Sequence, residues 1–318
     1  MTQNEVNLET PKLSILVSAH NSEATIQETL QSIPIEDSRI ELVLVDDGST
    51  DSTLNIMKNF QEKSSRNRIQ IYSTPNLGSA NARNIGIHNA IGEWLIFLDS
   101  DDKLVRLTVD AFLDNSNCFK HIHAIRYSYQ TVEGNSFPGK INELDFKEIM
   151  RQRGFWRYVY RKSYLQNNNL YFLPTFSDVN GFYVLDDWYF LLTFLATSPA
   201  LSGSDYVLYL YNNYQRSPTE EFSRYRMQIE REYLAFRSLG KSLKDINGAN
   251  LLFISEILYS RTYMITQLLE PSPSKTSKVQ LIIVFLSIQS RIKLVSKFMT
   301  KGFFLLLRVL IQKKQEKR

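Results

Sequence analysis

The chain has 318 residues, of which 43% are hydrophobic and 22% charged, and its formal net charge is +4. This composition is typical of a folded protein and excludes disordered, collagen-like and polytopic membrane chains, while the length allows one large α/β domain with an appendage. The single cysteine, Cys118, excludes an intramolecular disulfide and a cysteine-rich zinc site and is typical of a reducing compartment.

The first hundred residues alternate between strand-like and helix-like segments. The opening twelve residues are polar and lack the basic patch and apolar core of a secretory signal, which predicts a cytoplasmic protein. Short apolar runs predict buried parallel strands, and helical periodicity lies between them. The predicted strands are 13–19, 40–45, 69–72 and 94–98, and the helices include 23–33 and 79–90. This alternation predicts a doubly wound parallel sheet.

The pattern is weaker after residue 103. The elements expected here are a helix ending near residue 117, a strand at 122–129, an aromatic stretch at 155–165, a helix at 184–195 and further helices within 227–269. The motif Pro271-Ser272-Pro273-Ser274 predicts a linker to the last segment of the chain.

Three of the predicted strands end in polar clusters. These are Ser18-Ala19-His20-Asn21, Asp46-Asp47-Gly48-Ser49 and Asp99-Ser100-Asp101-Asp102. Ligands of doubly wound sheets bind beyond the carboxyl ends of the strands, so the clusters predict a binding site at that edge. The glycines that a dinucleotide-binding fold needs after its first strand are absent, and so is a phosphate-binding loop ending in Gly-Lys-Ser/Thr, which argues against an ATPase.

The acidic cluster follows directly on a strand that reads as buried. Asp99 and Asp101 are separated by one residue, so their carboxylates can aim at one point, and oxygen ligands suit Mg²⁺ or Mn²⁺. Such a cation would bridge a diphosphate and neutralise the charge that develops on it as a bond to the diphosphate breaks. The alternative is a solvated acidic turn or helix cap, where aspartate is common.

The clusters belong to a longer set of motifs in the first third of the chain. The set is Ser14-Ile15-Leu16-Val17-Ser18-Ala19-His20-Asn21, Val45-Asp46-Asp47-Gly48-Ser49-Thr50-Asp51, Asn76-Leu77-Gly78-Ser79-Ala80-Asn81-Ala82-Arg83-Asn84-Ile85-Gly86, and Gly92-Glu93-Trp94 through Asp99-Ser100-Asp101-Asp102. In order and spacing these motifs resemble glycosyltransferase family 2. The resemblance implies the GT-A fold, an α/β fold with a Rossmann-like, doubly wound, mostly parallel sheet, followed here by a helical C-terminal region.

The resemblance also implies roles for residues on the nucleotide side. Asp47 would contact the base, and Ser18 and His20 would line the nucleotide pocket. Arg83 would contact the donor, with a structural ion pair under the sheet as the alternative. The chain departs from the family where Ser18-Ala19-His20-Asn21 replaces the more common Pro-Thr-Tyr-Asn, so the planar ring of His20 stands in place of a tyrosine.

The metal and catalytic groups are implied in the same way. Asp101 would be the principal ligand of Mn²⁺ or Mg²⁺, and Asp99 would lie near the ribose or the metal. An inverting transfer also needs a base that takes the proton of the acceptor hydroxyl. By resemblance this base is Asp187, and Asp186 orients it or raises its pKa. The alternative is a pair of first-turn acids that favour a helix N-terminus.

Two tryptophans, Trp156 and Trp188, are candidates for an acceptor platform, although aromatic residues of this kind are more often core. Arg216 lies in a segment that resembles the family's closing Tyr-Arg-Ser motif and could touch the diphosphate; the alternative is a solvated surface arginine. We therefore expect a GT-A domain at 1–215, with a nucleotide and metal half at 12–102 and an acceptor half at 103–215. A helical extension at 216–270 and a basic tail at 271–318 would follow.

The basic tail carries 11 Lys and Arg residues and one acid, Glu316, whereas the rest of the chain has 26 basic and 32 acidic residues. On a helical wheel Lys293, Lys297 and Lys301 lie on one side and Val295 and Phe298 largely on the other. This pattern predicts a helix on an anionic membrane surface. The alternative is a helix pair packed on the body or on a second subunit, which leaves a homo-oligomer open.

Taken together, the motifs predict an inverting, metal-assisted glycosyltransferase. It would move a sugar from a nucleotide diphosphate-sugar to a glycan or lipid-linked acceptor, and a UDP-sugar is the expected donor. The reaction would belong to cell-surface polysaccharide or lipopolysaccharide synthesis. Its expected location is the cytoplasm, peripheral on the inner face of the cell membrane, and no nucleic-acid partner is expected. The alternatives are an inactive sugar-binding or scaffold protein of the same fold and a nucleotidyltransferase, which would usually carry a glycine-rich basic loop near the first strand.

Overall fold

The structure is a computed structural model that describes residues 10–64, 68–140, 154–172, 186–197 and 199–212. The chain divides into two compact units, Met1–Phe194 with Pro199–Arg216 and Leu195–Ser198 with Ser217–Arg318. The site discussed below belongs to the first unit. Arg216, the predicted helical extension and the basic tail lie outside the described residues. Among the residues described, no helix is both long enough and apolar enough to cross a membrane.

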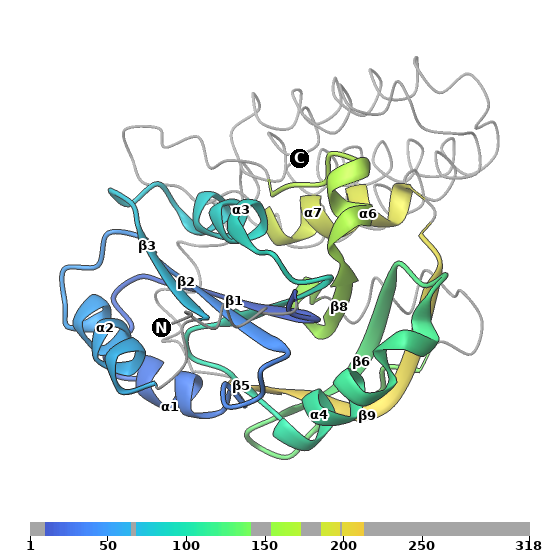
Figure 1. The fold of residues 1–318 in the computed structure, drawn as a ribbon, viewed down its shortest axis with the longest axis horizontal. Helices are drawn as coiled ribbons and strands as arrows, with labels where there is room; N and C mark the ends of the chain where they lie inside the picture. The colour runs from blue at the N-terminus through green and yellow to red at the C-terminus, as the bar shows by residue number, and fades with distance from the viewer. Residues whose placement is uncertain (1–9, 65–67, 141–153, 173–185, 198, 213–318) are drawn as a thin grey trace, which may run out of the picture. The chain divides into compact units, whose positions relative to one another are not determined.

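Four parallel strands form one half of the sheet, in the order β3-β2-β1-β4. Their bounds are β1 Leu13–Ala19, β2 Ile40–Asp46, β3 Ile69–Ser73 and β4 Trp94–Asp99. In the view of Figure 1, α3 (Ser79–Asn89) lies above these strands, and α1 (Ile26–Gln31) and α2 (Thr53–Lys63) lie below. Helices on both faces explain why β1, β2 and β4 are almost entirely buried and consist mostly of apolar residues. The predicted doubly wound arrangement is confirmed for this half.

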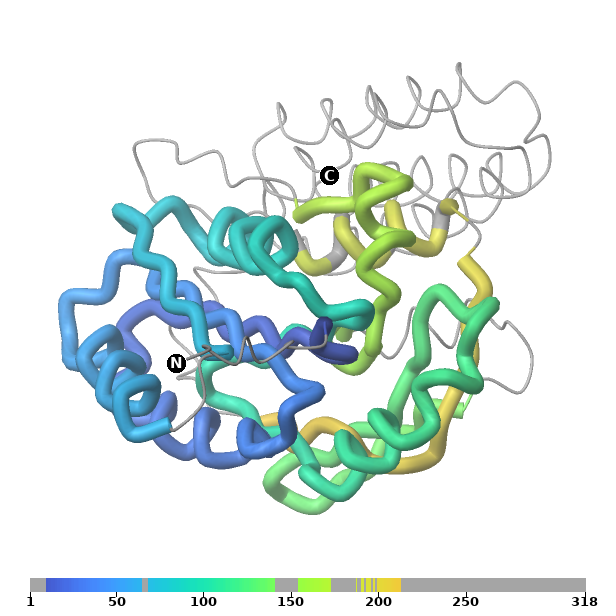
Figure 2. Tube along the Cα trace, in the orientation of Figure 1, coloured from blue at the N-terminus to red at the C-terminus, as the bar shows by residue number. Residues whose placement is uncertain are grey.

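The other half of the sheet is mixed rather than parallel. Its strands are β5 Lys103–Leu104, β6 Ala124–Thr131, β7 Ser136–Phe137, β8 Tyr158–Arg161 and β9 Leu201–Tyr211. Within the described residues the sheet continues from β4 in the order β8-β6-β9-β5, and β7 pairs with β6. β8 is antiparallel to both β4 and β6, whereas β9 runs parallel to β6. Figure 2 shows residues 201–211 running beside the green segment of β6.

The remaining helices of the part of the chain that the structure describes are α4 Arg106–Asn115, α6 Lys162–Asn167 and α7 Asp186–Ala196, with short 3-10 helices at Ser116–Phe119 and Phe155–Arg157. The predicted helix at 184–195 and the predicted strand at 122–129 are therefore present with shifts of one to two residues at their ends. Strand β9 was not predicted. It lies between β6 and β5 and ends at Tyr211, next to the last described residue.

Candidate functional site

The loops that follow β1 and β2 are bound to each other. Asn21 adopts a left-handed conformation with φ of 49°, which asparagine tolerates better than most residues. Its side-chain oxygen accepts the Thr50 N–H at 2.8 Å, and its own N–H donates to Ser49 Oγ at 3.0 Å. His20 Nδ1 donates to the main-chain oxygen of Asp47 at 2.8 Å. The two predicted polar clusters therefore form one connected edge.

The loop after β4 joins the same edge. Ser18 is the register partner of Asp99 across β1 and β4, so the last residues of these strands lie side by side. Beyond them, Ser22 Oγ and Ser100 Oγ share a hydrogen bond of 2.8 Å. Thr29 Oγ1, on α1, donates to the Ser100 main-chain oxygen at 2.9 Å. The structure thus brings all three predicted clusters together.

Asp47 is buried, with 3% of its surface exposed, and its carboxylate holds the segment between β3 and α3. One oxygen accepts hydrogen bonds from Thr74 Oγ1 at 2.6 Å and Leu77 N at 2.7 Å, and the other accepts Gly78 N at 2.7 Å. The next residue, Gly48, has φ of +70°, and a Cβ there would lie 2.6 Å from Asn76 N. Only glycine fits this turn without strain. The predicted contact between Asp47 and a nucleotide base stays a prediction.

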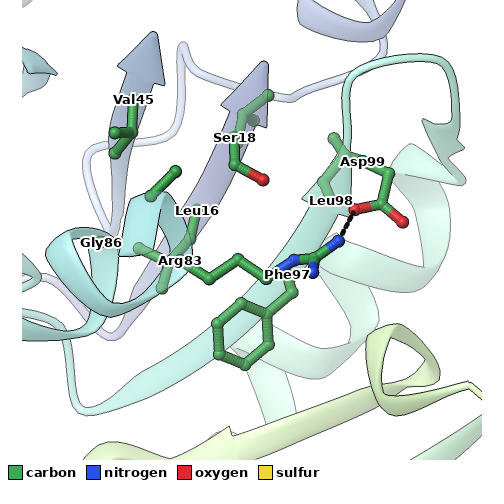
Figure 3. A pocket seen from close by; sticks show the side chains of 10 residues that line it. Leu16, Ser18, Val45, Arg83, Gly86, Phe97, Leu98 and Asp99 are labelled. Carbon is green, nitrogen blue, oxygen red and sulfur yellow. Dashed lines mark hydrogen bonds and ion pairs between the residues drawn. The ribbon is translucent and has the colours of Figure 1, made fainter. Parts of the chain in front are cut away.

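A small pocket lies between α3 and the carboxyl-terminal halves of β1 and β4 (Figure 3). Three of the polar residues predicted for the nucleotide line it, namely Ser18, Arg83 and Asp99. Arg83 reaches from α3 past Phe97 to Asp99, as Figure 3 shows. The remaining wall is mostly apolar and comes from Leu16, Val17, Val45, Ala82, Gly86, Phe97 and Leu98.

Arg83 is held by a carboxylate and by aromatic rings. Its Nη2 lies 2.9 Å from Asp99 Oδ1, and the side chains of Arg83 and Asp99 are 13% and 28% exposed. Its guanidinium carbon lies 4.7 Å from the ring centroid of Phe155 and 5.4 Å from that of Phe172. Such cation–π contacts stabilise a partly desolvated arginine. The ion pair that the sequence offered as the alternative for Arg83 is therefore present, and a contact with the donor stays a prediction.

Asn84, the neighbour of Arg83, fixes the aromatic side of this arrangement. Its side-chain oxygen accepts the Phe172 N–H at 2.8 Å, and its amide nitrogen donates to the Phe172 oxygen at 2.8 Å. This reciprocal pair of hydrogen bonds holds Phe172 beside Phe97, with ring centroids 5.3 Å apart. Asn84 therefore positions Phe172, one of the two rings that contact the Arg83 guanidinium.

Helix α7 packs against the same aromatic cluster. The ring of Phe190 stacks on Phe172 at 4.2 Å with an interplanar angle of 7°, and lies 5.7 Å from Phe97. Asp187, one turn earlier in α7, is partly buried. The element that carries the predicted base therefore contacts the Phe97 wall of the pocket. The side chains of Asp186 and Trp188 lie outside the described residues.

Asp102 and Tyr209 form a buried link that sequence reasoning did not find. Tyr209 Oη donates to Asp102 Oδ2 at 2.7 Å and accepts the Asp99 N–H at 3.1 Å. Burial, reinforced by the charges of Asp99 and Asp101, raises the pKa of Asp102 to about 8, although the bonds from Asn212 N and Tyr209 act in the opposite direction. No sequence signal connects residues 107 positions apart, so only the fold could reveal this link.

Trp156, the predicted acceptor residue, lies within an aromatic stack. It is 9% exposed and stacks with Tyr209 at 4.3 Å and Tyr211 at 5.2 Å. Tyr129 contacts it edge-on, with ring centroids 4.8 Å apart. The indole offers little free surface in this arrangement, so a role for Trp156 in acceptor binding stays a prediction.

The acidic turn after β4 offers few ligands to a cation. Within the described part of the chain, no three or more His, Cys, Asp or Glu side chains gather in a way that could hold a metal ion. Asp99 and Asp101 are both partly exposed at the end of β4, whereas Asp102 is 1% exposed and both of its oxygens accept protein hydrogen bonds. This arrangement fits an ion that takes one or two carboxylates and completes its shell with water and substrate phosphates, as Mg²⁺ commonly does.

The half-parallel, half-mixed sheet with its site at the carboxyl ends is the GT-A fold. The model described as Glycosyl transferase family 2 matches residues 14–171, and the chain belongs to this family. Among solved structures, that of S. aureus TarS 1–349 in complex with UDP-GlcNAc covers 88% of this chain and 82% of its own length, with a TM-score of 0.67 and 21% identity. At this identity the likeness shows the fold.

Curated relatives match part of the chain. A glycosyltransferase of Haemophilus influenzae is 34% identical over 131 residues, which are 39% of this chain and 50% of the relative. The poly(ribitol-phosphate) beta-N-acetylglucosaminyltransferase TarS of Staphylococcus aureus is 30% identical over 173 residues, 51% of this chain and 29% of TarS. The chain thus spans half or less of the length of these two relatives.

Proposed function

We infer that the chain is an inverting glycosyltransferase that moves a sugar from a nucleotide diphosphate-sugar to a glycan or lipid-linked acceptor. The observation that carries this proposal is that Ser18, Arg83 and Asp99 meet at the carboxyl ends of β1 and β4, in a chain of glycosyltransferase family 2. Ligands of doubly wound folds bind at this edge. A UDP-sugar is the expected donor, since the structure of TarS with UDP-GlcNAc has the same fold.

The nucleotide would occupy the edge formed by Ser18, His20, Asp47 and Arg83. His20 is partly exposed, and its hydrogen bond to the Asp47 main chain fixes the orientation of its ring. The Asp47 carboxylate holds the main chain of the segment before α3 and is the predicted partner of the base. A preformed edge of this kind reduces the ordering cost of binding.

Asp101 and Asp99 would hold a divalent cation, Mn²⁺ or Mg²⁺. When bound, such an ion neutralises the charge that develops on the leaving diphosphate, so no protonating acid is needed there. The protein's part is to aim two carboxylates at one place. Arg83 binds Oδ1 of Asp99, which restrains the rotation of this carboxylate. A mannosyltransferase of similar fold from Pyrobaculum calidifontis, 15% identical with a TM-score of 0.55, was solved in complex with GDP-Man and Mn²⁺.

Asp187 would act as the general base. It takes the proton of the acceptor hydroxyl while that oxygen forms a bond to the anomeric carbon, and the bond from the anomeric carbon to the diphosphate oxygen breaks on the opposite face. Attack opposite the leaving group inverts the configuration. Support comes from the packing of α7 on the pocket wall through Phe190. Asp186 would orient Asp187 or raise its pKa by like-charge repulsion.

The acceptor side is proposed from the relatives. TarS is named for its action on poly(ribitol-phosphate), and a Campylobacter jejuni relative, 28% identical over 167 residues, is named for GalNAc(5)-diNAcBac-PP-undecaprenol. A cell-surface glycan or a lipid-linked precursor is therefore the acceptor class, with Trp156 and Trp188 as candidate contacts. Such an acceptor also fits the basic tail at 271–318, which would hold the enzyme on the inner face of the cell membrane.

A panel of nucleotide sugars tests this proposal. The purified full chain is mixed with UDP-, GDP-, TDP- and CMP-sugars, each with and without Mn²⁺, and thermal stability and donor hydrolysis are recorded. We expect one donor class to raise the melting temperature only with the metal and to be hydrolysed slowly. A chain that binds sugars but hydrolyses and transfers none would be the inactive sugar-binding protein instead.

A further inference from the structure

The turn after β4, residues 99–102, is closed within itself and fixed to a distant strand. Asp102 N–H donates to the Asp99 main-chain oxygen at 3.1 Å, which closes the turn around Asp101. Tyr209 Oη, on β9, accepts the Asp99 N–H at 3.1 Å and donates to Asp102 Oδ2 at 2.7 Å. One hydroxyl therefore holds both ends of the turn that carries the proposed metal ligands.

This link also reaches the chain that follows β9. The second oxygen of Asp102, Oδ1, accepts the main-chain N–H of Asn212 at 2.6 Å. Tyr209 is fully buried and Asp102 is 1% exposed, so neither side chain has free surface to offer a ligand. Hydrogen bonds to a carboxylate in such a dry environment are strong, and the loss of either partner would leave a polar group unsatisfied.

We propose that Tyr209 and Asp102 are positioning residues, which set the direction of the Asp99 and Asp101 carboxylates and couple the metal-binding turn to the end of β9. The inference rests on the proposed function, because it assigns these residues a role toward the cation. Groups that hold the ligands of a metal, without touching it, typically change metal affinity or activity 10- to 100-fold when mutated.

Tyr209→Phe is the primary test, because it removes only the hydroxyl. Calorimetric titration of the full chain with MnCl2 at saturating UDP measures the metal affinity, and a thermal melt reports folding. We expect the Mn²⁺ dissociation constant to rise about 10-fold or more, at the lower end of the range for such supporting groups. UDP-sugar turnover should recover at higher Mn²⁺ concentration. The Mn²⁺ concentration that gives half-maximal turnover should therefore change more than kcat.

Tyr160→Phe is the matched control. Tyr160 is as buried as Tyr209, and its hydroxyl donates to the Phe155 main-chain oxygen at 2.7 Å, with no bond to the turn. Tyr209→Phe loses two buried hydrogen bonds and Tyr160→Phe loses one, so both variants should melt at lower temperature. Only Tyr209→Phe should lose metal affinity. Equal Mn²⁺ affinity in Tyr209→Phe, Tyr160→Phe and the wild type would show that Tyr209 is merely structural and would overturn the inference.

A second pair of variants decides the matter if Tyr209→Phe does not fold. Asn212→Pro deletes the N–H that donates to Asp102, whereas Asn212→Ala keeps it. The inference requires weaker Mn²⁺ binding in the proline variant than in the alanine variant, and equal binding would refute it. A wild-type chain that shows no metal-dependent binding of any nucleotide diphosphate would overturn the proposed function, and with it this inference.

Discussion

Asp99 is oriented from two directions before any ligand is present. Arg83 binds its carboxylate at 2.9 Å, and Tyr209 accepts its N–H at 3.1 Å. His20 is restrained in the same way by the main chain of Asp47. Side chains held like this lose little freedom when a substrate binds, which is how a protein keeps reacting groups aligned. At the scale of the residue, the geometry of the site is therefore set by the protein groups that bind each functional side chain.

Asp47→Asn is expected to lower the free energy of unfolding by about 1–3 kcal/mol, because a buried amide replaces one of the two oxygens that accept hydrogen bonds from Thr74, Leu77 and Gly78. Urea denaturation of the full chain measures this. Asp110→Asn on α4, a partly exposed position remote in sequence from this segment, is the control and should change stability little. Equal stability of the two variants would mean that Asp47 does not support the segment before α3.

Asp187→Asn is expected to lower kcat by roughly 10² to 10⁴, the usual contribution of a positioned general base, while donor affinity stays close to that of the wild type. Asp186→Asn should lower kcat less. Steady-state kinetics with a saturating donor and calorimetry of donor binding separate the two effects. If Asp186→Asn were the more damaging variant, the base would be Asp186.

At the scale of the element, the sequence predicts the parallel half of the sheet well. The strands β1, β2 and β4 are buried on both faces, so their apolar runs give strong signals with sharp ends. The three polar clusters follow those ends, which is why Ser18 and Asp99 could be expected in one place from the sequence, whereas Arg83, on α3, was expected there only from the family resemblance. The local hydrophobic pattern is sufficient to predict a strand that is fully buried and regularly connected to its neighbours.

The mixed half is less predictable because its partners are distant in sequence. Strand β9 has no buried residue before Leu208, so its burial gives no period-two pattern, and it is held by pairing with β6 and β5, with register irregularities beside Ser128. The contacts of Tyr209 with Asp99 and Asp102 depend on that pairing. Likewise, the burial of Trp156 against Tyr209 and Tyr211 could not be read from a run of aromatic residues.

His123 predicts a pH dependence at the joint between β6, α6 and β9. Its Nδ1 accepts the Ala200 N–H at 2.9 Å, and its ring stacks on Tyr164 at 3.9 Å. Burial, together with the charge of Arg161, lowers the pKa of His123 below its ordinary value of 6.5. At this residue protons therefore bind the unfolded chain more readily, and the contribution of His123 to stability should fall as the pH decreases below about 6.5. Above that pH His123 is neutral in both the folded and the unfolded chain, so it does not make stability depend on pH.

Thermal melts between pH 7.5 and pH 5.5 measure this dependence. His123→Gln removes the titration and should flatten the decrease in melting temperature relative to the wild type. His121→Gln, at an exposed position two residues earlier, is the control and should keep the wild-type slope. A slope that is unchanged in His123→Gln would contradict the assignment to His123.

At the scale of the whole molecule, charge is unevenly distributed along the chain. The segment 271–318 carries 11 basic residues and one acid, whereas the rest has an excess of acids. Basic residues near an anionic membrane contribute about 1 kcal/mol each. A lipid-linked acceptor would be met at that surface, so the proposed tethering and the proposed chemistry support each other.

Replacing Lys293, Lys297 and Lys301 by Gln should weaken binding to anionic vesicles by roughly 10²-fold, since three such residues contribute about 3 kcal/mol. Sedimentation of the full chain with vesicles that contain phosphatidylserine measures this, and added salt should have the same effect as the substitutions. Neutral phosphatidylcholine vesicles are the control. Equal sedimentation with both kinds of vesicle would contradict an electrostatic tether.

The central claim is that a divalent cation, held at the end of β4, binds a nucleotide diphosphate to this chain. Calorimetric titration of UDP into the wild type and into Asp101→Asn, each with and without Mn²⁺, tests it most directly. Because an uncharged amide is a weaker ligand than a carboxylate for a hard cation, we expect Mn²⁺ to increase UDP affinity in the wild type and to have little effect in the variant. The same metal-dependent gain in both proteins would contradict the account.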